Sequence, residues 1–246
     1  MTSAVQARAP RIRGAHAVFT GRAGGVSTGE FSALNLGRHV GDEDAAVSRN
    51  RELLAAELGA EPVFVDQVHS ARVHVLPATG PVPVVRADAM VTDRADVALA
   101  IMVADCLPVL LSDAGAGVVA AAHAGRVGLL DGVLERTVEA MSALGARAER
   151  LEVTVGPSIC GSCYEVPAEM REQAGARAPE SVATTIWGTP GLDLRAGAAA
   201  ALARAGVRRT AIDADHPCTL EDEDYFSYRR AARTGRFAGV IRREAP

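Results

Sequence analysis

The chain has 246 residues, of which 48% are hydrophobic and 23% charged, a composition typical of a globular protein with a sizeable core and unlike that of a disordered one. Its formal net charge of −4 at pH 7 argues against a general nucleic-acid-binding or membrane-surface protein. Every one of its 26 basic residues is arginine, which excludes reactions that need a lysine, such as Schiff-base formation.

The amino-terminal segment, residues 1–13, is predicted to be a flexible arm, and it lacks the apolar core of a signal peptide. No segment approaches the ~20 apolar residues that a membrane span needs. We therefore expect a cytoplasmic protein whose four cysteines are reduced, which favours metal binding or catalysis over disulfides. Residues 14–246 show no internal repeat and no linker, and they are predicted to form a single domain.

The first predicted strand, His16–Thr20, leads into a glycine-rich turn that contains Arg22. Backbone N–H groups of such a turn can approach an anion, although a plain flexible turn is commoner and no phosphate-loop pattern is complete. The first helix follows, with Asp42 or Asp44 as its cap and Gly59 at its end. The expected buried stripe of this helix consists of Val47, Leu54 and Leu58.

Two further strands are predicted at Pro62–Val65 and Val73–Leu76, followed by a proline-rich connection. His74 alternates with valines on the second of these strands, so we expect it to be an ordinary face residue. His69 lies near the end of the first strand, close to Gln67, and is the better candidate for a metal ligand.

The centre of the chain contains apolar runs that are predicted to be strands joined by turns: Val97–Val103, Val109–Leu111 and Val118–Ala122. If the last turn is centred between Ala114 and Gly115, facing residues have numbers that sum to 229, as do those of Cys106 and His123. Directly opposed residues have Cβ atoms roughly 4.5–5.5 Å apart. This register indicates a metal site or a Cys/His nucleophilic pair; a buried cysteine near a surface histidine is the plain alternative.

A single helix is predicted after His123, running to about Leu144 and ending at Gly145. Gly125 and Arg126 form the turn between the preceding strand and this helix, an arrangement suited to holding an anion. The expected apolar face of the helix consists of Leu130, Val133 or Leu134, Val138 and Met141.

Two cysteines, Cys160 and Cys163, follow a predicted strand at Leu151–Val155 in a C-x-x-C pattern that is used for zinc and for redox chemistry. Cys218 and His216 could complete a Cys3His structural site, but we favour ordinary thiols near a substrate loop. The remaining predicted elements are a helix at Pro167–Ala176, a loop containing Trp187, a helix from the Asp193 cap to Ala205 stopped by Gly206, and strands at Val207–Ala214 and Phe237–Ile241.

Three kinds of chemistry are open to the central residues. His69, Cys106 and His123 could bind one zinc ion with an open fourth position, which is a catalytic pattern. Cys106 could instead be a nucleophile activated by His123. Copper bound by Cys106, two histidines and Met102 is a less favoured third option. A true laccase cluster needs many imidazoles, whereas the chain has six histidines, and the H-x-E pattern of the usual zinc deaminases is absent.

Several motifs together resemble the laccase-domain family, whose members have been called polyphenol oxidases, purine nucleoside phosphorylases and peptidoglycan-editing factors. The most specific are Gln67-Val68-His69-Ser70, Ala104-Asp105-Cys106-Leu107-Pro108, His123-Ala124-Gly125 and Ser227-Tyr228-Arg229-Arg230 with Thr234-Gly235-Arg236. Further matches, among them Asn35-Leu36 and Gly156-Pro157 with Cys163-Tyr164-Glu165-Val166, extend the resemblance over nearly the whole chain.

The resemblance implies an α+β fold, a single domain of mixed β-sheets flanked by helices, with zinc on His69, Cys106 and His123. It also implies phosphate-dependent cleavage of adenosine, inosine and methylthioadenosine, together with deamination of adenosine. A purine nucleoside and phosphate are thus the expected partners, with no nucleic acid and no membrane, and a monomer or weak homodimer is expected. The alternatives are a cysteine- or metal-dependent amidase that edits a peptidoglycan precursor, and a zinc-binding module without catalysis.

The site hypothesis makes the three ligands catalytic and adds Asp105 as a proton carrier. The residues proposed to bind substrate or phosphate are Arg22, Asn35, Gln67, Gly125, Arg126, Tyr164 and Arg229, and the segment Tyr225–Tyr228 could add a stacking wall. The chain departs from the family where Trp-Arg-Gly commonly follows His-Ala-Gly, because it has Arg126-Val127-Gly128 there. Phosphorolysis then requires that Arg126 or Arg22 takes over the role of the missing arginine.

Overall fold

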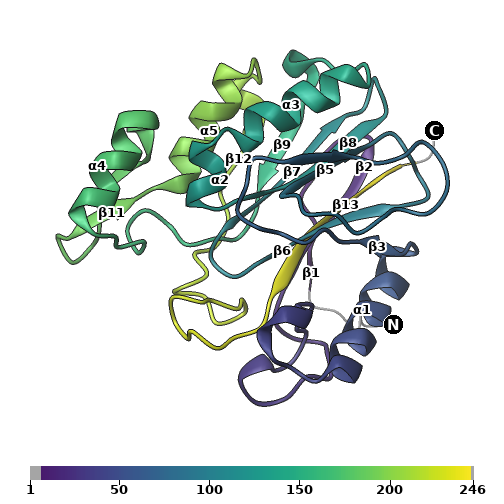
Figure 1. The fold of residues 1–246 in the computed structure, drawn as a ribbon, viewed down its shortest axis with the longest axis horizontal. Helices are drawn as coiled ribbons and strands as arrows, with labels where there is room; N and C mark the ends of the chain where they lie inside the picture. Colours follow the sequence, from purple (N-terminus) through teal and green to yellow (C-terminus); the bar gives the residue numbers. More distant parts are fainter. Residues whose placement is uncertain (1–6, 245–246) are drawn as a thin grey trace.

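Two β-sheets packed against each other form the centre of the molecule, and helices cover their outer faces (Figure 1). The computed structural model describes residues 7–244. One sheet has the strand order β1-β2-β13-β6-β3 and the other the order β12-β9-β7-β8-β5-β4. This arrangement is the expected α+β single domain of mixed sheets flanked by helices.

The strands of the five-stranded sheet are β1 (Ala7–Arg8), β2 (Ala15–Thr20), β3 (Pro62–Val63), β6 (Ala98–Val103) and β13 (Phe237–Arg243). Those of the six-stranded sheet are β4 (Val73–Val75), β5 (Ala89–Thr92), β7 (Leu107–Asp113), β8 (Val118–Ala124), β9 (Glu152–Val155) and β12 (Ile212–Asp213). A separate two-stranded ribbon consists of β10 (Val182–Thr184) and β11 (Pro190–Leu192). The α-helices are α1 (Asp44–Leu58), α2 (Arg126–Leu130), α3 (Val133–Ala143), α4 (Ala168–Arg177) and α5 (Leu194–Arg204).

The central strands have continuous apolar sequences because both of their faces are buried. Along β7, Leu107, Val109 and Leu111 pack under α3 and α5, whereas Leu110 points into the space between the sheets. Along β6, odd-numbered residues such as Ile101 face the same space, and even-numbered ones pack on the α1 side. Helices α3 and α5 thus cover the outer face of the six-stranded sheet, and α1 covers the outer face of the five-stranded sheet (Figure 1).

The β7–β8 hairpin has a different register from the one predicted. Pro108, not Cys106, is opposite His123, so facing residues sum to 231, and the turn is one residue later than expected. The sum changes by two, an even number, so each residue stays on the face of the sheet that was predicted for it. Cys106 and His123 therefore still belong to the same side of the sheet. The predicted direct opposition was wrong, but the predicted shared face is confirmed.

Helix boundaries also differ from the sequence prediction in two places. The single helix predicted after His123 is two helices, α2 and α3, because Gly132 adopts a left-handed conformation with φ 88°. The N-cap of α1 is Glu43 rather than Asp42 or Asp44, and no side chain caps it. Its predicted stripe is buried and its predicted stop at Gly59 is confirmed, with φ 61°.

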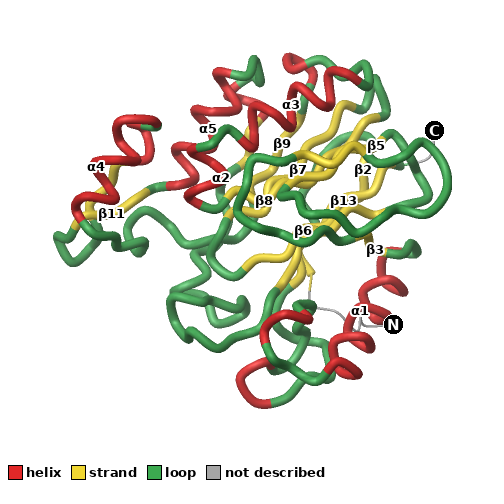
Figure 2. The backbone as a smooth tube through the Cα atoms, viewed as in Figure 1, coloured by secondary structure: helices red, strands yellow, loops and turns green. Residues whose placement is uncertain are grey.

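Two predicted irregular segments are more ordered than expected. The segment around Trp187 is the turn of the β10–β11 ribbon rather than a plain loop. The predicted arm lies outside the described residues for positions 1–6; from residue 7 on it is attached, because β1 pairs with β2 and Ile12 is buried. In contrast, the predicted strand Val207–Ala214 is reduced to β12, and residues 214–236 are loop (Figure 2). Within residues 7–244, none of the helices has the length and apolarity that crossing a bilayer requires.

Candidate metal centre

His123 lies at the end of β8 and is 3% exposed. Its Nδ1 is 2.8 Å from Oδ1 of Asp88, a carboxylate that is fully buried in front of β5. This hydrogen bond fixes the ring and leaves Nε2 as the nitrogen that can act as a ligand. Asp88 was not among the predicted site residues.

The same carboxylate shapes the loop that presents His69. Oδ1 of Asp88 accepts the N–H of His69 at 2.9 Å, and Oδ2 accepts the N–H of Ser70 at 2.6 Å and its hydroxyl at 2.7 Å. His69 is held there in a left-handed backbone conformation, φ 58°. Burial by itself raises the pKa of Asp88, but the hydrogen bonds from His123 and Ser70 outweigh burial and lower the pKa to about 2. The carboxylate is therefore ionised where it meets the two histidine segments.

Cys106 lies in the short connection between β6 and β7, directly after Asp105, whose φ of 87° turns the chain sharply. Its Sγ is 3.8 Å from Nε2 of His69, and the His69 and His123 rings are edge to face with centroids 4.7 Å apart. Burial raises the pKa of the Cys106 thiol, but His123 and His69 outweigh it, so the pKa is lowered; the pKa of His123 is raised in turn by Cys106 and Asp88 against the effect of burial.

The donor set fits a metal ion. One ligand atom each from His69, Cys106 and His123 lies within 4.8 Å of the others. Gly125 is required beside them, because a Cβ at this position would lie 2.8 Å from Cδ2 of His69 and 3.1 Å from Sγ of Cys106. Two imidazoles and one thiolate are common zinc ligands, and three protein ligands facing a cavity leave a fourth position for substrate or water. The metal group predicted from the sequence is thus brought together by the fold.

A pocket of about 590 Å³ opens over these three side chains. Its walls also carry three arginines, Arg126, Arg229 and Arg236, and the rings of Tyr164 and Tyr228. The guanidinium carbon of Arg229 is 5.1 Å from the centre of the Tyr164 ring. Burial and the Cys106 charge raise the pKa of Tyr164, while Arg126 and Arg229 oppose this shift. The pocket therefore combines aromatic surface with several positive charges.

Most of the predicted substrate residues line this pocket or lie beside it, but two do not. Gln67 lines it and is held by a pair of hydrogen bonds to the backbone of Met102, at 2.8 and 2.9 Å. Arg22 is absent from the pocket walls and instead donates to the carbonyl of Ser32. Asn35 is also absent; it is fully buried and accepts the N–H groups of Gly37 and Arg236.

Asp105 lies on the pocket wall with both carboxylate oxygens engaged. Oδ1 accepts the hydroxyl of Thr219 at 2.6 Å, and Oδ2 accepts the N–H of Arg229 at 2.6 Å. These bonds connect the metal-site loop to the long β12–β13 segment. In that segment only Tyr228 of the predicted stacking wall lines the pocket, because Tyr225 is 7% exposed and packs against Phe237.

Sequence reasoning missed Asp88, Arg236 and His39 as residues of the site. Arg236 and His39 line the pocket, and Asp88 orients its deepest ligand. A single acid before an apolar strand, Ala87-Asp88-Ala89, is the only local signal for Asp88. His39 and Arg236 lie 197 positions apart in the chain, and no local pattern predicts that they meet.

The Cys3His site with His216, the less favoured alternative for the C-x-x-C cysteines, is not the group that the fold forms. Among the described residues, Cys160, Cys163 and Cys218 cluster with Glu221, not with His216. Nε2 of His216 is 3.1 Å from the hydroxyl of Thr154, and its ring packs edge-on against Phe19. The Met102 sulfur, considered as a copper ligand, accepts a hydrogen bond from Arg51 at 3.6 Å.

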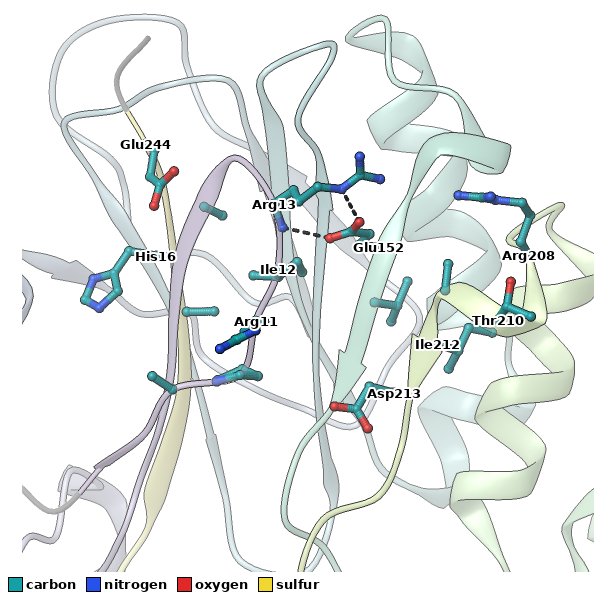
Figure 3. A pocket seen from close by; sticks show the side chains of 16 residues that line it. Arg11, Ile12, Arg13, His16, Glu152, Arg208, Thr210, Ile212, Asp213 and Glu244 are labelled. Carbon is teal, nitrogen blue, oxygen red and sulfur yellow. Dashed lines mark hydrogen bonds and ion pairs between the residues drawn. The ribbon is translucent and has the colours of Figure 1, made fainter.

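A larger pocket, of about 800 Å³, lies between residues 9–17 and strands β9 and β12 (Figure 3). Its walls are mixed in charge, and Arg13 pairs with Glu152 across it (Figure 3). Neither of the metal-ligating groups found in residues 7–244 contributes to its walls. Cavity volume alone therefore does not identify the functional site.

The chain is similar in sequence to known proteins over nearly its whole length. A profile of the family described as "Multi-copper polyphenol oxidoreductase laccase" matches residues 16–244. A purine nucleoside phosphorylase of Streptomyces coelicolor is 50% identical over 234 residues, covering 94% of this chain and 96% of that protein. One of Corynebacterium glutamicum is 48% identical over 238 residues, with 94% and 96% covered.

Solved structures show the same fold. A Neisseria meningitidis protein of the DUF152 family superposes with a TM-score of 0.88 at 37% identity, covering 98% of this chain and 99% of that one. YlmD from Geobacillus stearothermophilus superposes with a TM-score of 0.86 at 32% identity, covering 96% and 94%.

Proposed function

Because the chain belongs to the multi-copper polyphenol oxidoreductase laccase family, and its relatives are named purine nucleoside phosphorylases, we propose that it is a zinc-dependent purine nucleoside phosphorylase. The observation that carries the proposal is the pocket of about 590 Å³ that joins the His69, Cys106 and His123 group to three arginines. The substrates proposed are adenosine, inosine and methylthioadenosine. In the reaction an oxygen of phosphate bonds to C1′ of the ribose as the bond to the purine nitrogen breaks.

The protein's own side chains are proposed to divide the work as follows. Arg126 and Arg229, whose charges both act on the pKa of Tyr164, bind phosphate, because guanidinium groups match its charge and geometry. Tyr164 and Tyr228 provide surface for the purine ring. A zinc ion held by His69, Cys106 and His123 would supply Lewis-acid polarisation of a substrate atom.

Arg126 is proposed to replace the family arginine that is absent at Val127. It is the first residue of α2 and lines the pocket, whereas Val127 is absent from the pocket walls and is 41% exposed. Arg22 is no longer proposed for this role, because the fold places it outside the pocket.

Deamination of adenosine is proposed as a second activity of the same pocket. In that reaction water replaces the amine of the purine and ammonia leaves, so a group that moves a proton is needed. Asp105 is the proposed carrier, since its carboxylate lies at the pocket wall beside Cys106.

The test is to incubate the purified, metal-loaded protein with adenosine, with and without phosphate, and to separate the products by chromatography. Adenine formed only with phosphate is expected from phosphorolysis, and inosine formed in both conditions from deamination. Cys106→Ala should abolish both activities. Metal binding without consumption of any nucleoside would contradict the proposal and support the binding module instead.

The phosphate role of Arg126 is tested by Arg126→Ala, with Arg136→Ala on the exposed side of α3 as the matched control. A hydrogen bond to a charged group contributes about 1.5–3 kcal/mol. We therefore expect the KM for phosphate to rise about tenfold to a hundredfold in Arg126→Ala and not in the control. Equal behaviour of the two variants would contradict this assignment.

One observation favours a second candidate, a cysteine amidase that acts on a cell-wall precursor. Asp88, His123 and Cys106 form a chain of carboxylate, imidazole and thiol, and the thiol pKa is lowered, as thiol nucleophiles require. Hydrolysis of an amide that survives complete metal removal but not thiol alkylation would support this candidate. Activity lost with the metal and restored with it would contradict it.

A further inference from the structure

Four potential metal ligands gather outside the pocket, in two loops that follow neighbouring strands. Cys160 and Cys163 come from the loop after β9, and Cys218 and Glu221 from the loop after β12. One donor atom from each lies within 4.8 Å of the others. All three cysteines are free thiols; Cys163 is buried, and Cys160 and Cys218 are half-buried.

This geometry is close to that of a tetrahedral thiolate site. Zinc–sulfur bonds of about 2.3 Å in a tetrahedron place the sulfurs about 3.8 Å apart. The four donors therefore need to approach one another only slightly to reach one ion. Two of the cysteines have the C-x-x-C spacing of structural zinc sites, and three thiolates select a soft metal such as zinc over magnesium or calcium.

The two loops are held in place independently of any ligand. Ser158 and Cys218 form an isolated parallel bridge, and the N–H of Cys160 points at Sγ of Cys218 at 3.4 Å. Arg195 of α5 donates to carbonyls of both loops, to Ser158 at 2.5 Å and to Pro217 at 2.7 Å. The donors are thus preorganised, which reduces the conformational cost of binding an ion.

We propose that Cys160, Cys163, Cys218 and Glu221 bind a second, structural zinc ion. Burial and the neighbouring cysteines raise the pKa of the Cys163 thiol, so this thiol is protonated when no cation is bound. A bound divalent cation would remove this proton, because coordination strongly favours the thiolate.

The second ion would brace the wall of the pocket. Each cysteine is adjacent in sequence to a residue that touches the pocket or Asp105: Ile159 and Tyr164 line the pocket, and Thr219 donates to Asp105. The N–H of Ile159 also donates to the carbonyl of Asp105 at 3.0 Å. The proposal does not depend on the proposed reaction, since a structural ion acts only by fixing these neighbours.

The test is the metal content per chain of untagged protein, for wild type, Cys106→Ala, Cys218→Ser and the double variant. We expect two zinc ions per chain in the wild type, one in Cys106→Ala, one in Cys218→Ser and none in the double variant. Zinc content reduced by Cys106→Ala but unchanged by Cys218→Ser would overturn the proposal. So would a disulfide among the three cysteines, detected by alkylation of the unreduced native protein.

A second measurement is independent of any folding defect in Cys218→Ser. Cobalt loaded into Cys106→Ala should give the intense thiolate charge-transfer absorption of a three-sulfur site, because the first site has lost its only thiolate. Glu221→Gln should release the remaining zinc to a chelator faster, whereas Glu223→Gln, in the same acidic run, should not. Absence of thiolate absorption in the cobalt-loaded protein would also overturn the proposal.

Discussion

Asp88 is the residue on which the arrangement of the first metal group, formed by His69, Cys106 and His123, depends. Its Oδ1 accepts from both the His69 N–H and the His123 ring, so one atom sets the relative position of two ligands. Its Oδ2 is occupied by Ser70. A carboxylate can accept at both oxygens, whereas an amide can accept at only one. The site therefore requires an acid at this position.

Asp88→Asn is expected to weaken metal binding about tenfold to a hundredfold, the usual effect of losing a partner that orients a ligand. Competition with a chromogenic chelator measures this, and circular dichroism checks that the variant folds. Asp93→Asn, at an exposed position of the next turn, is the control. A metal affinity equal to that of the control would show that Asp88 does not orient the ligands.

Gly125→Ala tests the close approach of the backbone to the ligands. The added Cβ would lie 2.8 Å from the His69 ring, so the ring or the Cys106 thiol must move and the metal affinity should fall. Gly115→Ala is the matched control, because its nearest neighbour is at 3.3 Å and far from the site. Chelator competition again measures the effect, and unchanged affinity would mean that the loop shifts without disturbing the ligands.

At the scale of elements, the turn of the β7–β8 hairpin decides which residues face each other. Gly117 has φ 64°, and its N–H donates to the carbonyl of Asp113, which closes the turn between β7 and β8. The buried carboxylate of Asp113 accepts the N–H groups of Gly115, at 2.9 Å, and Arg147, at 2.8 Å, and pairs with Arg150. This turn places His123 opposite Pro108.

Asp113→Asn is expected to lower the free energy of unfolding by about 1–3 kcal/mol at pH 7, because buried donors lose a charged acceptor. Burial raises the pKa of Asp113, but the Arg147 N–H and Arg150 outweigh it, and the pKa lies below its ordinary 3.8. A carboxyl group with a lowered pKa in the folded state stabilises the protein at pH values above its ordinary pKa. This stabilisation is lost as the pH falls through the folded-state pKa.

Urea denaturation of wild type and Asp113→Asn should therefore give a stability difference that is full at pH 7 and narrows below about pH 4. Asp215→Asn, which changes an exposed carboxylate, should show little difference at either pH. A difference between wild type and Asp113→Asn that grows on acidification would contradict the assigned sign.

For the whole molecule, the first metal group lies where the chain passes between the two sheets. His69 lies between β3 and β4, and Cys106 between β6 and β7; in each case the first strand belongs to the five-stranded sheet and the second to the six-stranded sheet. His123 belongs to the six-stranded sheet. An ion bound there would connect both segments that pass between the sheets, the β3–β4 and β6–β7 connections, to strand β8.

Removal of the metal is therefore expected to lower the melting temperature. A ligand at a hundred times its Kd stabilises the native state by about 2.7 kcal/mol, which corresponds to roughly 5–10 °C for a chain of this size. Thermal melts with and without chelator measure the shift, and Cys106→Ala should show a smaller one. Identical melting temperatures of wild type with and without chelator would contradict the prediction.

The sequence by itself was sufficient to predict the strands β2 and β13, the end of α1 at Gly59 and the Asp193 cap of α5. Each of these features depends on residues that are close together in the chain. Motif resemblance was sufficient to predict His69, Cys106 and His123 as a candidate metal group, and the fold brings their ligand atoms together. Only the tertiary structure placed Asp88 between the histidines, moved Arg22 out of the pocket, set the register at Pro108 and joined Glu221 to the cysteines. Local propensity acts over a few residues, whereas these contacts join segments that meet only when two sheets pack and their loops converge.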